Sequence, residues 1–215
     1  MDKDAVWAAI DSQRLRTADL LEGLSEEQWR HPSLCDGWTV RDVAAHLTLQ
    51  QVRLGQALLV AVKHPGGLNR IIRDSARSRA NLPVDQLVAG IRAMVGSRRH
   101  NIGVSYLETL IDILVHGQDI AIPLQLNLEM LPAATAVAAT RVWSYGGKGK
   151  ARVFHKMPFQ GFRLTATDIC WSAGEGTEIL GPISAILLLL TGRLAALPQM
   201  TGPGVELLHR QLVRD

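Results

Sequence analysis

Apolar residues recur at helical spacing through most of the first 145 residues. In the segment 4–21, for example, Val6, Ile10 and Leu15 belong to a series of apolar positions close to the period of a helix. Proline and glycine separate the segments of this kind from one another. The pattern predicts a short turn at 25–29 and helices at 4–21, 39–63, 69–80, 83–99, 105–120 and 131–145.

The pattern changes at Gly146, where GGKGK is typical of a flexible linker. Beyond it, Gly174 and Gly176 separate two short runs and suggest a hairpin between them. The predicted strands are 162–167, 169–172 and 177–180, followed by helices at 182–193 and 205–213. The fold class is therefore mainly α, with residues 1–145 as a helical bundle and residues 146–215 as a small C-terminal α+β region.

Two helix starts carry side chains that can satisfy free backbone N–H groups. Ser25 and Gln28 have the spacing of a capping box. Thr39 and Asp42 have the same spacing, with aspartate as a variant that also suits the positive end of the helix dipole. A helix is therefore expected to begin directly after Thr39.

Composition excludes several classes of protein. The chain has 215 residues, of which 47% are hydrophobic and 20% charged, so it is not disordered. The apolar stretch Ile183–Leu190 is too short to span a bilayer, and the N-terminus lacks the apolar core of a signal peptide. Two cysteines support neither a disulfide framework nor a zinc finger. We expect a cytoplasmic protein without a membrane partner, either a monomer or a homodimer.

The net charge of +3 does not indicate nucleic-acid binding. The densest basic stretch, Arg70–Arg79, also contains Asp74 and two serines, which is typical of a solvated helix face. Aromatic residues make up only 5% of the chain, too few to suggest a platform for stacking bases. No nucleic-acid partner is expected.

Three polar residues stand out because they lie in apolar helices. Asp112 and His116 are four residues apart, so their side chains share one helix face. His46 lies in another amphipathic helix. Two imidazoles and a carboxylate are a common ligand set for zinc, nickel or ferrous iron; alternatively, they form a satisfied polar pair within a core. Asp119 either orients a ligand from behind or is a polar residue of the last turn.

The same residues lie in motifs that resemble a known family. LCDGWTVRDVAAHL (Leu34–Leu47) is similar to the N-terminal signature of the mycothiol-dependent maleylpyruvate isomerase family, which belongs to the DinB-like metalloproteins. DILVHGQD (Asp112–Asp119) matches a second element of the family, and TATDICWSAGEGTEILGPISAILLLLTGR resembles its C-terminal part. The resemblance covers nearly the whole chain.

This resemblance implies a DinB-like four-helix bundle that holds a divalent metal, usually zinc. Carried over by motif, the metal ligands are His46, Asp112 and His116. The acidic position is often glutamate in the characterised isomerase, whereas this chain has the shorter aspartate. The C-terminal portion is also expected to be shorter than that of the isomerase.

The resemblance further implies an enzyme that activates a low-molecular-weight thiol, namely mycothiol, the thiol of actinobacteria. The thiol would be transferred to a small electrophilic substrate or would isomerise it, so the protein would be an S-transferase or an isomerase. The alternatives are a non-catalytic metal-binding or regulatory DinB-like module and a purely structural helical protein.

Four further residues receive expected roles. Cys35 is expected to be a packing residue rather than the nucleophile, and Trp38 is expected to anchor the start of its helix. Arg41 or Arg53 would hold acidic groups of the cofactor or substrate, although an exposed helix face is the commoner place for either.

Overall fold

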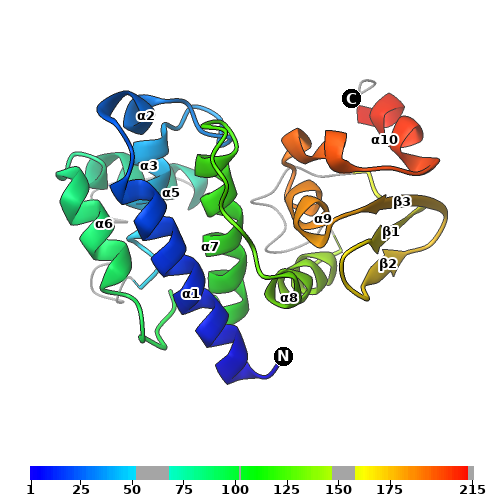
Figure 1. The fold of residues 1–215 in the computed structure, drawn as a ribbon, viewed down its shortest axis with the longest axis horizontal. Coiled ribbons are helices and arrows are strands. Elements are labelled where there is room, and N and C mark those ends of the chain that lie inside the picture. Colours follow the sequence, from blue (N-terminus) through cyan, green and yellow to red (C-terminus); the bar gives the residue numbers. More distant parts are fainter. Residues whose placement is uncertain (52–67, 102, 147–157, 213–215) are drawn as a thin grey trace. The chain divides into compact units, whose positions relative to one another are not determined.

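The computed structural model describes residues 1–51, 68–101, 103–146 and 158–212, and divides the chain into two compact units (Figure 1). The first unit is Asp2–Glu129, and the second comprises Met130–Asp215 together with Met1. Each unit has its own core. Among the described residues, no helix is both long and apolar enough to cross a membrane.

The first unit is helical. Its elements are α1 (Lys3–Glu22), α2 (Glu26–Arg30), α3 (Val40–Leu47), α5 (Leu68–Arg79), α6 (Val84–Arg92) and α7 (Tyr106–Ala121). Helix α1 packs against α6 and α7, and α3 packs against the same two helices, so these four form a closed bundle. The fold class predicted for this part of the chain, a four-helix bundle, is confirmed.

The core of the bundle departs from the predicted face of α1 in one respect. Trp7, Ile10 and Leu21 are fully or almost fully buried, but Leu15 is 40% exposed. The buried face instead includes the polar side chains of Gln13, Arg14 and Thr17. Burying such groups is costly unless they are hydrogen-bonded, so the partners of Arg14 matter for the site described below.

Both predicted capping boxes are present. Thr39 accepts a hydrogen bond from the backbone N–H of Asp42, and the Asp42 carboxylate accepts one from the backbone N–H of Thr39. The box formed by Ser25 and Gln28 begins α2 in the same way. The predicted helix to residue 63 is wrong at its described end: α3 stops at Leu47 and residues 48–51 form a turn.

The second unit combines helices with a three-stranded sheet. Its elements are α8 (Pro132–Trp143), β1 (Phe162–Ala166), β2 (Ser172–Gly174), β3 (Thr177–Gly181), α9 (Ile183–Leu190), a 3-10 helix (Leu194–Gln199) and α10 (Gly204–Leu212). Helix α9 is apolar on nearly all sides and packs against α8, β1 and the 3-10 helix, which explains its burial. The small C-terminal α+β region is thus confirmed.

The order of the strands corrects the predicted hairpin. β1 lies in the middle, antiparallel to β2 and parallel to β3, so β2 and β3 are not partners. The two glycines instead serve the contact with the start of β1. Gly174 and Gly176 have φ angles of 82° and 124°, and a Cβ atom on either would collide with the backbone carbonyl of Phe162 or Gly161. The strand predicted at 169–172 is also wrong, because β2 begins only at Ser172.

The division into units differs from the predicted domains, 1–145 and 146–215. Helix α8 falls in the second unit because it packs against α9. The domain boundary after residue 145 stays a proposal, because most of the predicted linker GGKGK falls within 147–157, outside the described residues.

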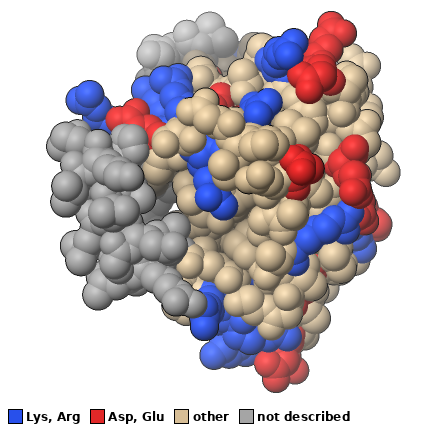
Figure 2. Space-filling model, turned by 90° about the vertical axis from the view of Figure 1, so that its left-hand side faces the viewer, with Lys and Arg blue, Asp and Glu red and all other residues tan. Residues whose placement is uncertain are grey.

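Charged side chains of both signs are interspersed on the face shown in Figure 2. Within the basic stretch on α5, Arg70 lies 3.6 Å from the Asp74 carboxylate. Arg77 donates to the carbonyl of Gly37, and Arg79 donates to the hydroxyl of Thr48. These arginines therefore contact their own unit.

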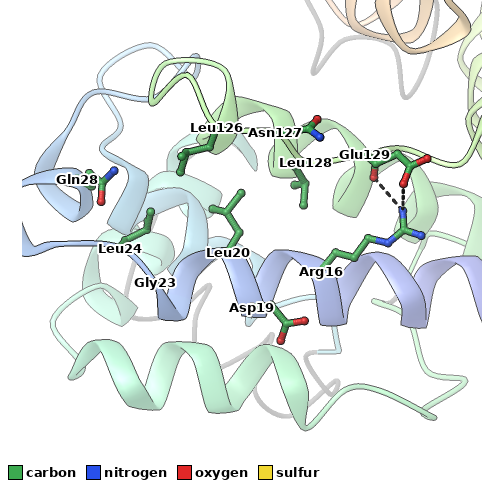
Figure 3. Close-up of a pocket in the computed structure, with 10 residues that line it drawn as sticks. All are labelled: Arg16, Asp19, Leu20, Gly23, Leu24, Gln28, Leu126, Asn127, Leu128 and Glu129. Atoms are coloured by element: carbon green, nitrogen blue, oxygen red, sulfur yellow. Dashed lines mark hydrogen bonds and ion pairs between the residues drawn. The ribbon is translucent and has the colours of Figure 1, made fainter.

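One open hollow of about 610 Å³ lies in the first unit, between the second half of α1 and the segment 126–129 (Figure 3). An ion pair between Arg16 and Glu129, with an N–O distance of 3.6 Å, lies at its edge. Leu20 and Leu126 supply apolar surface. None of its lining residues is one of the predicted metal ligands, so the hollow is separate from the site described next.

Candidate metal centre

Helices α3 and α7 bring the three predicted ligands together. Asp112 Oδ1 lies 3.4 Å from His46 Nε2 and also 3.4 Å from His116 Nε2. The two imidazole rings are 4.9 Å apart between centroids and nearly perpendicular. One ligand atom from each residue lies within 4.8 Å of the others. The cluster therefore joins residues that are 66 positions apart in the sequence.

The geometry of this cluster fits a tetrahedral divalent ion. With metal–ligand bonds of about 2.0–2.1 Å, neighbouring ligand atoms of a tetrahedral zinc ion lie about 3.3–3.4 Å apart. Both carboxylate–imidazole distances match this value. The Asp112 side chain is 29% exposed, so an ion can reach the cluster from solvent.

The protonation of Asp112 and His116 is shifted by their mutual contacts. Burial by itself raises the pKa of the Asp112 carboxyl group, but the charge of His46 and hydrogen bonds with both histidines outweigh it. The pKa of Asp112 is consequently well below its usual range. Burial also lowers the pKa of His116, yet its hydrogen bonds and the charge of Asp112 raise that pKa well above the ordinary value. Asp112 is thus a carboxylate, the form that binds a metal.

Local sequence explains why α7 presents these groups. Ser105 and Glu108 form a third capping box, in which Ser105 is the N-cap and the helix begins at Tyr106. From that start, Asp112 and His116 fall one turn apart on the same face. The acidic-x-x-x-His spacing identified in the sequence therefore gives the observed convergence.

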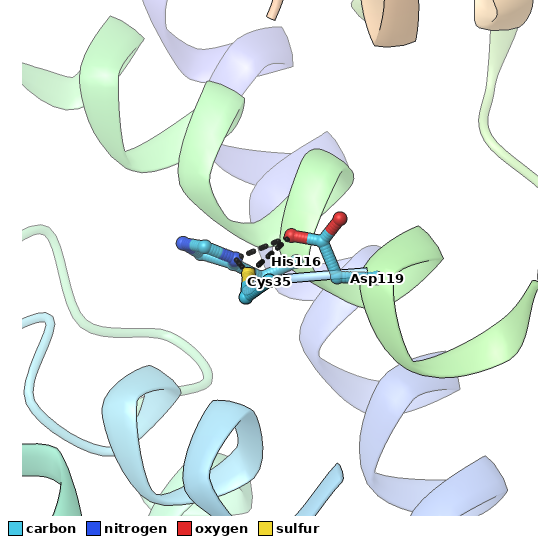
Figure 4. Close-up of side chains that lie close together, drawn as sticks. All are labelled: Cys35, His116 and Asp119. Atoms are coloured by element: carbon cyan, nitrogen blue, oxygen red, sulfur yellow. Dashed lines mark hydrogen bonds and ion pairs between the residues drawn. The ribbon is translucent and has the colours of Figure 1, made fainter. Parts of the chain in front are cut away.

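Asp119 holds the opposite edge of the His116 ring (Figure 4). Its Oδ2 lies 2.8 Å from His116 Nδ1, and its side chain is completely buried. In the neutral imidazole, the form that binds a metal, Nδ1 donates to this carboxylate and the lone pair lies on Nε2, which faces Asp112. A carboxylate behind a metal-binding histidine fixes the ring and its tautomer. Of the two interpretations of Asp119, the geometry supports the orienting one.

Cys35 lies beside the same two residues, which the sequence did not indicate. Its Sγ is 3.1 Å from Asp119 Oδ2 and 3.7 Å from His116 Nδ1 (Figure 4). A hydrogen bond from the Leu34 N–H to the Asp119 carbonyl, 3.1 Å long, ties this loop to α7. Cys35, His116 and Asp119 also form a second group with ligand-like spacing. Cys35 is therefore more than a packing residue.

The arrangement nevertheless does not make Cys35 an activated nucleophile. The nitrogen of His116 nearest to its sulfur is Nδ1, which already faces the Asp119 carboxylate. A base that activates a thiol needs a free nitrogen lone pair directed at it. The geometry agrees with the expectation that the reacting sulfur comes from outside the protein.

Trp38 contributes to the site as well as to the start of α3. Its ring packs edge-on against His46, with 5.5 Å between centroids. This contact restricts the orientation of the imidazole, which makes Trp38 a neighbour of the cluster.

Neither of the two arginines is placed at the cluster within the described part of the chain. Arg41 donates to the carbonyls of Ala80 and Leu82, at 2.6 and 2.7 Å, in the segment that follows α5. Arg53 lies outside the described residues.

Two residues of the site were not predicted from the sequence. Gln50 donates from Nε2 to Asp112 Oδ2 at 2.7 Å, and Arg14 donates to Gln50 Oε1 at 3.2 Å. Arg14 is fully buried. Its position four residues after Ile10, on the apolar face of α1, was the available signal, because a charge on such a face requires a partner. Gln50 follows the end of α3 and carries no comparable signal.

Part of the chain matches a known family in sequence. Residues 10–103 match the family model described as the mycothiol maleylpyruvate isomerase N-terminal domain. The predicted resemblance is therefore confirmed. The matched region includes His46 but ends before Asp112 and His116, so the second half of the candidate centre rests on spacing and geometry.

Solved structures extend the likeness over nearly the whole chain. A crystal structure of the mycothiol-dependent maleylpyruvate isomerase matches with a TM-score of 0.60 and 14% identity, covering 94% of this chain and 93% of that one. A histidine-to-alanine mutant of that isomerase matches with the same values. No curated protein matches in sequence. The fold is thus that of this DinB-like isomerase. Since 93% of the isomerase chain is covered, the expectation of a shorter C-terminal portion is wrong.

Proposed function

We propose that this chain is a divalent-metal-dependent enzyme, with zinc as the metal and mycothiol as the thiol it activates. The observation that carries the proposal is the convergence of His46, Asp112 and His116, with both carboxylate–imidazole distances at 3.4 Å. The N-terminal domain match and the likeness to the mycothiol-dependent isomerase support the choice of thiol. The substrate is a small electrophile, which is either isomerised or conjugated to the thiol.

Each residue of the centre has a separate task. His46, Asp112 and His116 would hold the ion, and Asp119 would keep Nε2 of His116 directed at it by accepting from Nδ1. Three protein ligands leave a position open. When bound, the ion supplies the positive charge that makes a coordinated thiol lose its proton at neutral pH.

The two candidate reactions differ in the fate of the sulfur. In an isomerisation, the thiolate sulfur bonds to one carbon of an activated double bond, and the π electrons move onto the activating group. After rotation about the resulting single bond, this electron pair re-forms the double bond and the sulfur leaves as thiolate. In a transfer, the sulfur stays bonded and the neighbouring carbon takes up a proton. The isomerisation is covalent catalysis by an external nucleophile, whereas the transfer is conjugation to it.

The test is elemental analysis of protein purified without an affinity tag, followed by a conjugation assay with mycothiol and a fluorogenic electrophile. We expect about one zinc ion per chain, and turnover that needs both the metal and the thiol. His116→Ala should lose both. His31→Ala is the matched control, because His31 is exposed and its ring nitrogen Nδ1 lies 2.8 Å from the neighbouring carbonyl of Pro32, away from the three ligands.

The outcomes separate the alternatives. Metal without turnover with any thiol favours the non-catalytic or regulatory module. Protein that binds no divalent metal favours the structural interpretation, in which the cluster is a polar network. Normal zinc content in His116→Ala contradicts the proposed ligands.

A further inference from the structure

The two carboxylate oxygens of Asp112 have different partners. Oδ1 lies 3.4 Å from a ring nitrogen of each histidine. Oδ2 instead accepts a hydrogen bond of 2.7 Å from the side-chain amide of Gln50. The carboxylate therefore presents one oxygen to the candidate metal position and has the other held by the protein.

The orientation of the Gln50 amide is determined by Arg14. A guanidinium group has only hydrogen-bond donors, so the amide atom that faces it must be the oxygen. Arg14 donates to Gln50 Oε1 at 3.2 Å, which leaves the amide nitrogen to donate to Asp112. An amide turned the other way would place its oxygen against the carboxylate.

Arg14 is itself fixed in place. Its side chain is completely buried and donates to the backbone carbonyl of Met94 at 2.8 Å. It also lies 3.5 Å from the carboxylate of Asp11, one turn earlier on α1. A rigid series of hydrogen bonds thus runs from α1, through Gln50, to the acidic residue of α7.

We propose that Gln50, oriented by Arg14, is a positioning residue that keeps Asp112 a one-oxygen ligand of the metal. This inference rests on the proposed function, because it needs an ion held by Asp112. With Oδ2 retained by Gln50, the carboxylate cannot occupy a second coordination position. That coordination position would stay available to the thiol. The hydrogen bonds from Arg14 through Gln50 to Asp112 would therefore set how many positions on the metal are open.

The test compares Gln50→Met with Gln13→Met. Methionine keeps the length of glutamine but cannot donate to Asp112, and its thioether is only a weak acceptor for Arg14. Gln13 is the matched control because it is also a buried glutamine, 2% exposed against 4% for Gln50, and it lies on α1. Zinc affinity is measured by competition with a chromogenic chelator, and coordination number by the visible absorption of the cobalt-substituted protein. Thermal unfolding of the metal-free proteins checks that each variant folds.

We expect Gln50→Met to bind zinc about 10–100-fold more weakly, the usual cost of losing a contact behind a metal ligand. Its cobalt spectrum should change, because a freed carboxylate can bind through two oxygens. Gln13→Met should match the wild type in both measurements. Wild-type affinity and an unchanged spectrum in folded Gln50→Met would overturn the inference while leaving the proposed function intact. Wild-type protein that binds no metal overturns both.

Two further variants keep the test decisive. Gln50→Glu has nearly the same shape and still accepts from Arg14, but it cannot donate to Asp112, so it replaces Gln50→Met in the comparison if that variant does not fold. A cobalt spectrum identical to the wild type would count against the inference. Arg14→Met combined with Gln50→Met should bind zinc no more weakly than Gln50→Met alone, because Arg14 acts through Gln50. If the losses of zinc affinity from the two substitutions add fully in the double variant, Arg14 does not act through Gln50.

Discussion

Asp112 is the residue on which the candidate centre depends most. Its Oδ1 lies within 3.4 Å of both histidines, and its Oδ2 connects them to the buried hydrogen bonds of Gln50. The pKa of its carboxyl group lies well below the usual range because the histidines outweigh the effect of burial. Its charge and its position therefore support the same role.

Removing the charge of Asp112 should empty the centre. Asp112→Asn keeps the shape but provides a neutral amide, so we expect zinc affinity to fall by more than about 100-fold, the upper range for an indirect contact. Asp112→Glu keeps the carboxylate on a longer side chain and should retain the metal. Metal content and chelator competition measure both effects. Asp85→Asn, at an exposed position on α6, is the control and should bind as the wild type does.

Cys35 provides a separate test of where the reacting sulfur comes from. Cys35→Ser keeps a hydroxyl donor for Asp119, so we expect the metal and most of the thiol-dependent activity to remain. Cys170→Ser is the control, because Cys170 is the other cysteine and is exposed. Activity is measured with added mycothiol at saturating metal. Loss of turnover in Cys35→Ser with zinc still bound would rule out a purely external thiol.

At the scale of the element, the starts of α3 and α7 are what bring the ligands to one place. Each helix begins at a capping box, and His46 lies in the last turn of α3 while Asp112 and His116 lie within α7. Because a box fixes which residue comes first, it also fixes the direction in which every later side chain points. The caps are therefore part of the geometry of the site.

Weakening the cap of α3 should affect the metal as well as stability. Thr39→Ala removes the side chain that accepts from Asp42, and we expect it to lower the free energy of unfolding by about 0.5–2 kcal/mol. Zinc affinity should fall too, since His46 is on this helix. Ser25→Ala removes the equivalent cap of α2, which carries no ligand, and should lower stability alone. Equal zinc affinity in the two variants would show that the cap of α3 does not contribute to the geometry of the metal site. Denaturant unfolding and chelator competition provide the measurements.

Local patterns predicted much of this arrangement, and tertiary contacts account for the rest. The spacing of Asp112 and His116 and the box at Thr39 are visible within a few residues of sequence, and both are present in the structure. The contact of Gln50 with Arg14 depends on how α1 packs near the end of α3, which no short pattern encodes. The sheet order was missed for the same reason: Gly174 and Gly176 mark a close approach to another segment rather than a turn between adjacent strands.

At the scale of the whole molecule, the candidate centre and the sheet belong to different compact units. His46, Asp112 and His116 all lie in Asp2–Glu129, whereas the strands and α9 lie in the other unit. Leu164 of the central strand β1 and Leu110 of α7 are both fully buried, each in the core of its own unit. This separation predicts that damage to one core can leave the chemistry of the other unit in place.

Leu164→Ala should destabilise the second unit without removing the metal. Truncating a buried leucine to alanine costs about 2–5 kcal/mol, because it removes apolar contacts and leaves a cavity. We expect a lower unfolding temperature for the second unit but the same zinc content per chain, since no proposed ligand lies in that unit.

Leu110→Ala is the matched variant: it makes the same change on the helix that carries Asp112 and His116, and should reduce both stability and zinc affinity. Calorimetry and elemental analysis of the two proteins distinguish these results. Loss of zinc from Leu164→Ala, with the first unit still folded, would show that the metal centre needs the C-terminal unit.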